Sequence, residues 1–147
     1  MSQNGLIVVL LSLLGGFTPA LAVDKQVVVV TASSSPLTTI SSLNLRKLYF
    51  GINVTLSGQA IQAARNNSDP QIYQVFLQTL VSMSEKRYEH RLLTLTTQNG
   101  RPRPIMVTRS GDLTAMLLDN PQLVSYMWID EVDQSKLRVL RILWQEK

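Results

Sequence analysis

The sequence contains no cysteine and only one histidine among its 147 residues. A chain without thiols forms neither disulfides nor thiolate metal sites, so its fold depends on core packing. His90 lies between Glu89 and Arg91, and no second imidazole exists to complete a metal site. We therefore expect no metal and no cofactor, and a structural or surface role for His90.

Catalytic signatures are missing as well. No serine lies in a Gly-x-Ser-x-Gly elbow, the strained turn that exposes a nucleophile. A serine-based triad would have to recruit His90 by chance, since no other histidine could act as the base. The sequence favours a protein that is not an enzyme, with an exported hydrolase as the remote alternative.

The first 22 residues contain no charged side chain. An apolar run from Leu6 to Leu14, interrupted only by Ser12, is too short to span a bilayer and is followed by Ala20-Leu21-Ala22, which fits a cleavage site. This pattern predicts a signal peptide at 1–22 and a mature domain at 23–147. The lack of a basic residue before the run leaves open a retained anchor or a misplaced start codon.

The mature chain of about 125 residues is long enough for one domain with a real core and too short for two. It keeps the whole net charge of +4, and the sequence pI is about 9.7. Export predicts a periplasmic location, with no nucleic acid as partner and no stable membrane span after removal of the leader. A mildly basic exported protein favours either a small oxyanion, phosphate or sulfate, or an envelope protein as its partner.

Apolar runs and cap residues divide the mature chain into alternating strands and helices. The expected strands are 26–31, 59–64, 106–107, 123–129 and 137–143. Helices are expected after Ser41-Ser42, from Asp69-Pro70, after a Ser82-to-Glu85 capping box, and from Ser110. This order predicts an α/β three-layer sandwich with a mostly parallel sheet.

A polar turn between the strand 59–64 and the helix that starts at Pro70 is the candidate binding site. Unpaired N–H groups at a helix N-terminus attract anions, and a guanidinium just upstream adds further donors. Arg65, Asn67 and Ser68 could therefore hold a small oxyanion. The alternative for Arg65 is a surface ion pair with Asp69 or a C-terminal carboxylate, because Asp69 as N-cap already neutralises the helix start.

A second basic segment contains Arg101, Arg103 and Arg109, the first two of which alternate with prolines. Prolines stiffen a loop and lower the entropy lost when it docks. These arginines could face the same cleft or an acidic partner, although solvated loop charge is the commoner outcome.

The segment Leu45-Arg46-Lys47-Leu48-Tyr49-Phe50-Gly51 is similar to an L-x-x-I-F-x-G element of periplasmic phosphate-binding proteins, the substrate-binding components of phosphate ABC transporters. Ala64 to Phe76 follows in the family's order of a strand, an Arg-containing turn and a helix with a buried Phe. Three later segments also keep that order: Leu93 to Pro104, Ser110 to Leu118, and Asn120 to Tyr126. The resemblance implies a short stand-alone relative with a type 2 periplasmic binding protein-like fold.

The chain departs from the family at the ligand-binding turn. The resemblance implies Ser and Gly donors there, but this chain has Asn67, Ser68, Asp69 and Pro70. A carboxylate repels an anion and proline removes one donor. Gln122 and Ser125 also stand where the family has glycines.

Two functions follow. The first is a binding module for phosphate or a similar oxyanion. The second is a binding-protein fold without a ligand that serves as an interaction or assembly subunit of the envelope.

Overall fold

The computed structural model describes residues 15–16 and 24–147. The predicted signal peptide lies outside the described residues except for Gly15 and Gly16. The strands are β1 (Gln26–Ala32), β2 (Val54–Leu56), β3 (Gln59–Asn66), β4 (Ile105–Val107), β5 (Leu123–Trp128) and β6 (Leu137–Gln145). The helical segments are α1 (Ser42–Tyr49), α2 (Pro70–Phe76), the π segment η1 (Leu77–Val81), α3 (Glu85–Asn99), α4 (Ser110–Asp119) and the 3₁₀ turn η2 (Ile129–Glu131). Within the described part of the chain, none of these helices has the length and apolar character to cross a membrane.

All six strands belong to one mixed sheet in the order β2-β3-β5-β1-β6, with β4 paired to β3. β1 is antiparallel to both β5 and β6, and β2 is antiparallel to β3, whereas β3 pairs in parallel with β5 and β4. The α/β class is confirmed, but the prediction of a mostly parallel sheet is not. The four valines of β1 are buried because the strand is central, and a central antiparallel strand gives the same pattern as a parallel one.

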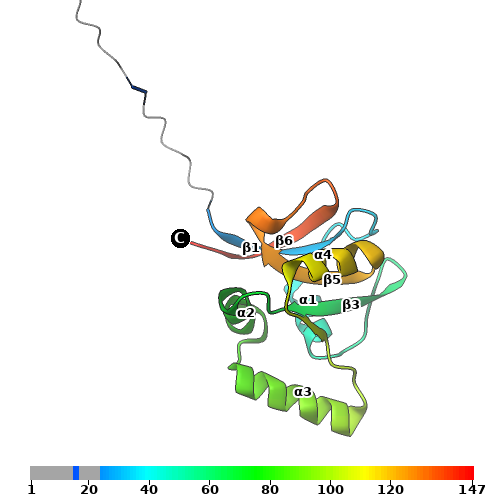
Figure 1. The fold of residues 1–147 in the computed structure, drawn as a ribbon. Helices are drawn as coiled ribbons and strands as arrows, with labels where there is room; N and C mark the ends of the chain where they lie inside the picture. The colour runs from blue at the N-terminus through cyan, green and yellow to red at the C-terminus, as the bar shows by residue number, and fades with distance from the viewer. Residues whose placement is uncertain (1–14, 17–23) are drawn as a thin grey trace, which may run out of the picture.

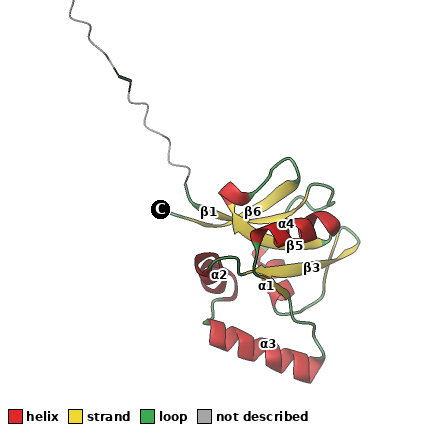
Figure 2. Ribbon diagram, in the orientation of Figure 1, coloured by secondary structure: helices red, strands yellow, loops and turns green. Residues whose placement is uncertain are grey.

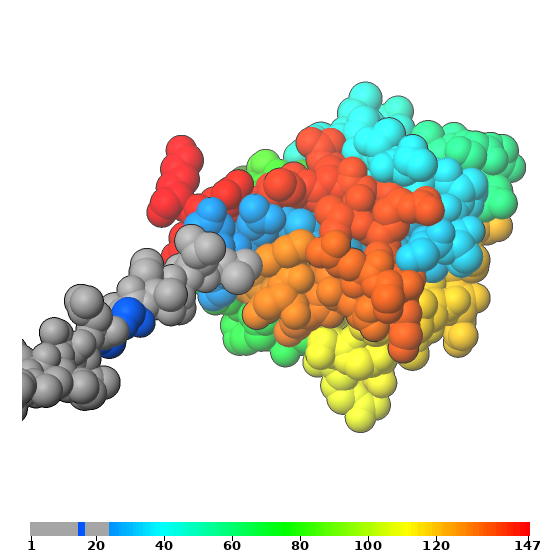
Figure 3. All heavy atoms as spheres, turned by 90° about the horizontal axis from the view of Figure 1, so that it is seen from above, coloured from blue at the N-terminus to red at the C-terminus, as the bar shows by residue number. Residues whose placement is uncertain are grey.

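Helices cover both faces of this sheet. α4 contacts β1 and β5 on one face, and α1 and α2 contact β3 from the other (Figure 1). In the view from above, the α1 region and α4 lie on opposite sides of the central strands (Figure 3). α3 lies farther from the sheet than α2 (Figure 2) and contacts η1.

Several helix boundaries follow their predicted local signals. Ser41 caps α1 by accepting from the Asn44 N–H, and Asp69 caps α2 by accepting from the Ile72 N–H. The capping box placed at Ser82 is wrong, since Ser82 has a left-handed φ of 55° that ends η1, and Ser84 caps α3 instead. Ser110 is the first residue of α4 and makes no cap hydrogen bond; Arg109 occupies the cap position.

The core beneath α1 and α2 is an aromatic cluster in which each hydroxyl has a backbone partner. Its four fully buried rings are Tyr49, Phe76, Tyr88 and Tyr126, and Phe50 and Tyr73 pack against them from outside this set. Phe76 stacks on Tyr126 with centroids 4.9 Å apart and meets Tyr49 edge-on at 4.8 Å. The Tyr49 hydroxyl donates to the Ala64 carbonyl, and the Tyr88 hydroxyl donates to the Tyr49 carbonyl. Such pairs stabilise a core beyond the area they bury, so this cluster fixes α1, α2 and α3 against β3 and β5.

Candidate functional site

Arg65 lies near the end of β3 and is only 5% exposed. Its Nη1 donates to Glu89 Oε1 of α3 at 2.6 Å, and its Nε donates to the Pro104 carbonyl at 3.0 Å. Arg103 pairs with the other carboxylate oxygen of Glu89. These three side chains form a Glu89 ion-pair cluster (Arg65, Glu89, Arg103) that ties β3, α3 and the loop before β4 together.

Burial and the ion pair act on the pKa of Arg65 in opposite directions. Burial lowers this pKa, but the hydrogen bond to Glu89 raises it, and the net shift is upward. The guanidinium also lies 5.8 Å from the centroid of the Tyr88 ring. Arg65 is therefore held as a buried cation whose charge is already compensated within the chain.

The turn after Arg65 uses its own donors internally. The Asn67 N–H donates to the Val107 carbonyl at 2.8 Å, and the Ser68 N–H donates to Asn66 Oδ1 at 2.9 Å. Asn66 is fully buried, and its Nδ2 donates to the carbonyl of Tyr126. Neither backbone N–H of Asn67 or Ser68 therefore points outward as an anion donor, although the Ser68 hydroxyl has no recorded partner among the described residues.

Asp69 occupies the start of α2 with both carboxylate oxygens. Oδ1 accepts from the Ile72 N–H at 2.8 Å, and Oδ2 accepts from Trp128 Nε1 of β5 at 2.8 Å. α2 has seven residues, and Pro70 at its first position contributes no N–H. The electropositive end of this short helix is satisfied by a side chain of the protein itself.

Of the predicted basic loop, Arg103 joins Arg65 at Glu89, whereas Arg101 and Arg109 do not. Arg103 pairs with Glu89, whereas Arg109 pairs with Asp112 at the surface and its side chain is 79% exposed. Arg101 instead lies against Gly51, where φ is +73°. A Cβ on Gly51 would stand 2.6 Å from the Pro102 carbonyl oxygen, so only glycine permits this loop to pack on the end of α1.

Gln122 and Ser125, which stand where phosphate-binding proteins have glycines, make hydrogen bonds within the sheet. The Ser125 hydroxyl donates to the Ala64 carbonyl, and Ser125 is fully buried between β3 and β1. The Gln122 carbonyl accepts from the Gln62 N–H and starts the pairing of β5 with β3. The Ser125 side chain and the Gln122 backbone therefore support the sheet.

Sequence reasoning missed Glu89 and Trp128, the residues that engage Arg65 and Asp69. Glu89 has the local pattern of an ordinary surface residue on a helix, 24 positions from Arg65. The one available signal was its placement next to the inward Tyr88, which brings it to the edge of the buried face. Nothing in the sequence near Trp128 signals its bond to Asp69.

No protein-family model and no curated protein sequence matches the chain. Solved structures do match. A phosphate transport receptor of the ABC type from Vibrio cholerae superposes with a TM-score of 0.57 at 14% identity, covering 80% of this chain and 46% of that one. A putative phosphate ABC transporter substrate-binding protein from Clostridium perfringens, with bound phosphate, gives 0.59 at 14% identity, covering 80% and 44%. PstS from Borrelia burgdorferi gives 0.55 at 16% identity, covering 80% and 47%.

The chain has the fold of the matched part of these binding proteins. Sequence identities of 14 to 16% show a similar fold and nothing more. The chain spans less than half the length of each of the three structures.

Proposed function

We propose that this protein is a non-enzymatic, periplasmic module that uses a substrate-binding-protein-like fold to interact with another envelope protein. One observation carries this proposal: the charge of Arg65 and the backbone N–H groups of Asn67 and Ser68, at the turn after β3, are already paired within the protein. Arg65 is paired with Glu89, and the first turn of α2 is capped by Asp69. Binding an oxyanion there would require breaking buried internal hydrogen bonds, each of which costs about 1–3 kcal/mol when a partner is left unsatisfied.

A thermal melt in phosphate or sulfate tests this proposal. A ligand that binds only the folded state adds about 2.7 kcal/mol at a hundredfold its dissociation constant. For a domain of this size that gain raises the melting temperature by roughly 10 °C. We expect no shift with phosphate or sulfate up to millimolar concentrations, and a shift of several degrees would contradict the proposal.

Cross-linking in intact cells tests whether the protein interacts with another envelope protein. We expect a short-range cross-linker to join the protein to at least one other envelope protein, giving a species of higher mass that is absent in the uncross-linked sample. Recovery of only the monomer under these conditions would count against an interaction role. Fractionation and mass spectrometry of the mature chain, expected to begin near Val23, test the proposed export.

Phosphate binding is the second candidate, and the observation favouring it is the fold shared with a protein whose structure contains bound phosphate. Under this function Arg65, Asn67 and Ser68 contact the anion, and Arg65 leaves Glu89 when it does so. The melt would then shift with phosphate, and Arg65→Ala would abolish the shift. The same experiment therefore separates the two functions.

A further inference from the structure

β6 forms an open edge of the sheet. Its one strand neighbour in the described part of the chain is β1, and that pairing has register shifts at Val27/Val28 and Val29/Val30. An open edge accepts an added strand, whereas bulges shorten the length over which regular pairing can run. β6 therefore offers a short stretch of edge to an extended chain.

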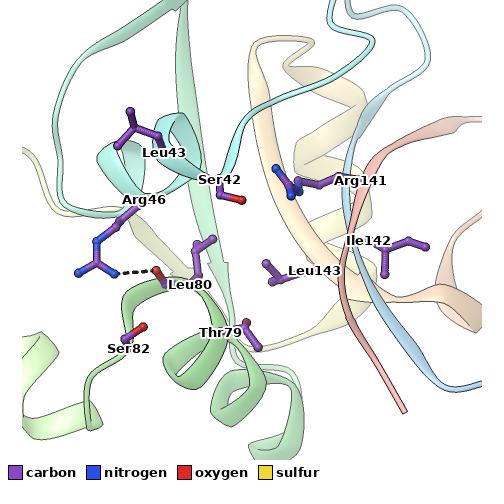
Figure 4. Close-up of a pocket in the computed structure, with 9 residues that line it drawn as sticks. All are labelled: Ser42, Leu43, Arg46, Thr79, Leu80, Ser82, Arg141, Ile142 and Leu143. Carbon is purple, nitrogen blue, oxygen red and sulfur yellow. Dashed lines mark hydrogen bonds between the residues drawn. The ribbon is translucent and has the colours of Figure 1, made fainter. Parts of the chain in front are cut away.

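A hollow of about 300 Å³ lies beside this edge, between β6, α1 and η1 (Figure 4). We call it the β6 groove; its lining residues are Ser42, Leu43, Arg46, Thr79, Leu80, Ser82, Arg141, Ile142 and Leu143. Figure 4 shows Arg141 and Leu143 pointing from β6 toward α1 and η1, while Ile142 points the other way. Leu43 and Ile142 are 63% and 51% exposed, and they lie on opposite sides of this edge (Figure 4).

Apolar side chains lie on both faces of the sheet beside β6, as an added strand with side chains on both faces requires. Successive side chains of a strand point to opposite faces of the sheet. A segment paired with β6 would place alternate side chains in the groove, against Leu43 and Leu143, and the others beside Ile142. An alternating segment can therefore use both exposed apolar surfaces at once.

The positive charge of the groove favours acidic side chains at the remaining positions of that segment. Arg46 and Arg141 line it, and no acidic residue does. Arg46 Nη1 donates to the carbonyls of Leu80 and Val81, and Arg141 Nη1 donates to the carbonyl of Ile40. Each guanidinium has five N–H donors, so both arginines are fixed in place with donors left for a carboxylate.

We propose that the β6 groove binds an extended segment of a partner protein in which apolar residues alternate with carboxylates. This proposal rests on the proposed interaction function and names its surface. The segment's backbone pairs with β6, one apolar side chain fills the groove beside Leu43, and a carboxylate accepts hydrogen bonds from Arg46 or Arg141.

Fluorescence anisotropy with labelled peptides tests this binding. The probe is a peptide of about eight residues that alternates valine and glutamate, and its control has lysine in place of glutamate. We expect the glutamate peptide to bind at least about tenfold more tightly than the lysine peptide. Equal affinities, or no binding at about 1 mM peptide, would overturn the proposal.

Matched variants locate the site. Leu43→Asp changes an exposed side chain in the groove, so the fold is retained, and we expect it to weaken binding of the glutamate peptide at least about tenfold by repulsion. Leu93→Asp changes a residue of α3 that is 52% exposed and should leave binding unchanged. Equal effects of the two variants would show that the groove is not the site. Arg141→Glu, with its melting temperature checked, should reverse the preference toward the lysine peptide.

Photo-cross-linking in cells separates failure of this surface from failure of the interaction function. A photoreactive residue at position 43 is expected to label a partner, whereas one at position 93 is not. Labelling from position 93 alone would overturn the β6 groove and keep the interaction function, and labelling from neither would contradict both. A sedimentation shift of the purified protein that Leu43→Asp abolishes would assign the groove to a second copy of this chain instead.

Discussion

Replacing Arg65 with alanine distinguishes a structural arginine from a ligand-binding one. In the folded protein Arg65 donates to the Pro104 carbonyl and to Glu89, and its side chain is 7% exposed. Removing it leaves the buried carbonyl without this donor, which costs about 2 kcal/mol. The lost ion pair adds only about 1 kcal/mol, because Glu89 is 34% exposed and keeps Arg103 as a partner. The expected loss is therefore about 3 kcal/mol.

Urea denaturation monitored by tryptophan fluorescence measures this loss. In a thermal melt, at roughly 4 °C per kcal/mol for a domain of this size, the melting temperature should fall by roughly 12 °C. The control is Arg109→Ala, because the Arg109 side chain is 79% exposed and pairs only with Asp112; it should change stability by less than about 0.5 kcal/mol. A double-mutant cycle between Arg65→Ala and Glu89→Ala should give a coupling energy of about 1 kcal/mol.

The result that would refute this reasoning is an Arg65→Ala variant as stable as the parent. Such a variant would show that the guanidinium contributes no net stability to the folded state. If the same variant also lost a phosphate-dependent gain in melting temperature, the phosphate-binding function would be supported and the interaction function would fail.

Three further predictions concern stability. In urea titrations, Gly51→Ala should lower the free energy of unfolding by about 2–3 kcal/mol more than Gly58→Ala does. Both glycines have a left-handed φ, but only at Gly51 would the new Cβ meet a backbone oxygen. Equal losses for the two variants would refute the close contact. Asp69→Ala should cost about 2 kcal/mol in thermal melts, from a lost cap and a Trp128 N–H without its acceptor, and an unchanged melt would contradict both roles. Burial raises the pKa of all three tyrosines of the aromatic cluster, so these tyrosines stay protonated to a higher pH in the folded state than in the unfolded state. Stability should therefore fall as the pH rises above about 10, by up to roughly 4 kcal/mol per pH unit, and absorbance at alkaline pH should show tyrosine ionisation together with unfolding; ionisation without unfolding would refute it.

The sequence by itself determined part of the local structure. Ser41 and the Asp69-Pro70 pair were sufficient to place the starts of α1 and α2, because a cap acts on an N–H group only three positions away. The valine run was sufficient to place β1 in the interior. The α/β class followed from the alternation of such elements, and the order of its segments was sufficient to suggest a binding-protein fold, which the solved neighbours support.

Strand direction was decided only by the tertiary structure. β1 pairs with β5 and β6, which are about a hundred residues later in the chain, and a buried run of valines carries no information on the direction of its neighbours. The mixed sheet and the open edge at β6 could therefore not be predicted from the sequence pattern.

The chemistry of the turn after β3 was decided in the same way. The sequence supplied Arg65 and Asp69, and whether they face a ligand depended on Glu89, 24 positions away, and on Trp128, 59 positions away. Local patterns extend over a few residues, whereas these hydrogen bonds form only when α3 and β5 are packed against β3 and α2. Long-range packing therefore gives Arg65 and Asp69 hydrogen-bond partners within the fold, and anion binding at this turn stays a prediction.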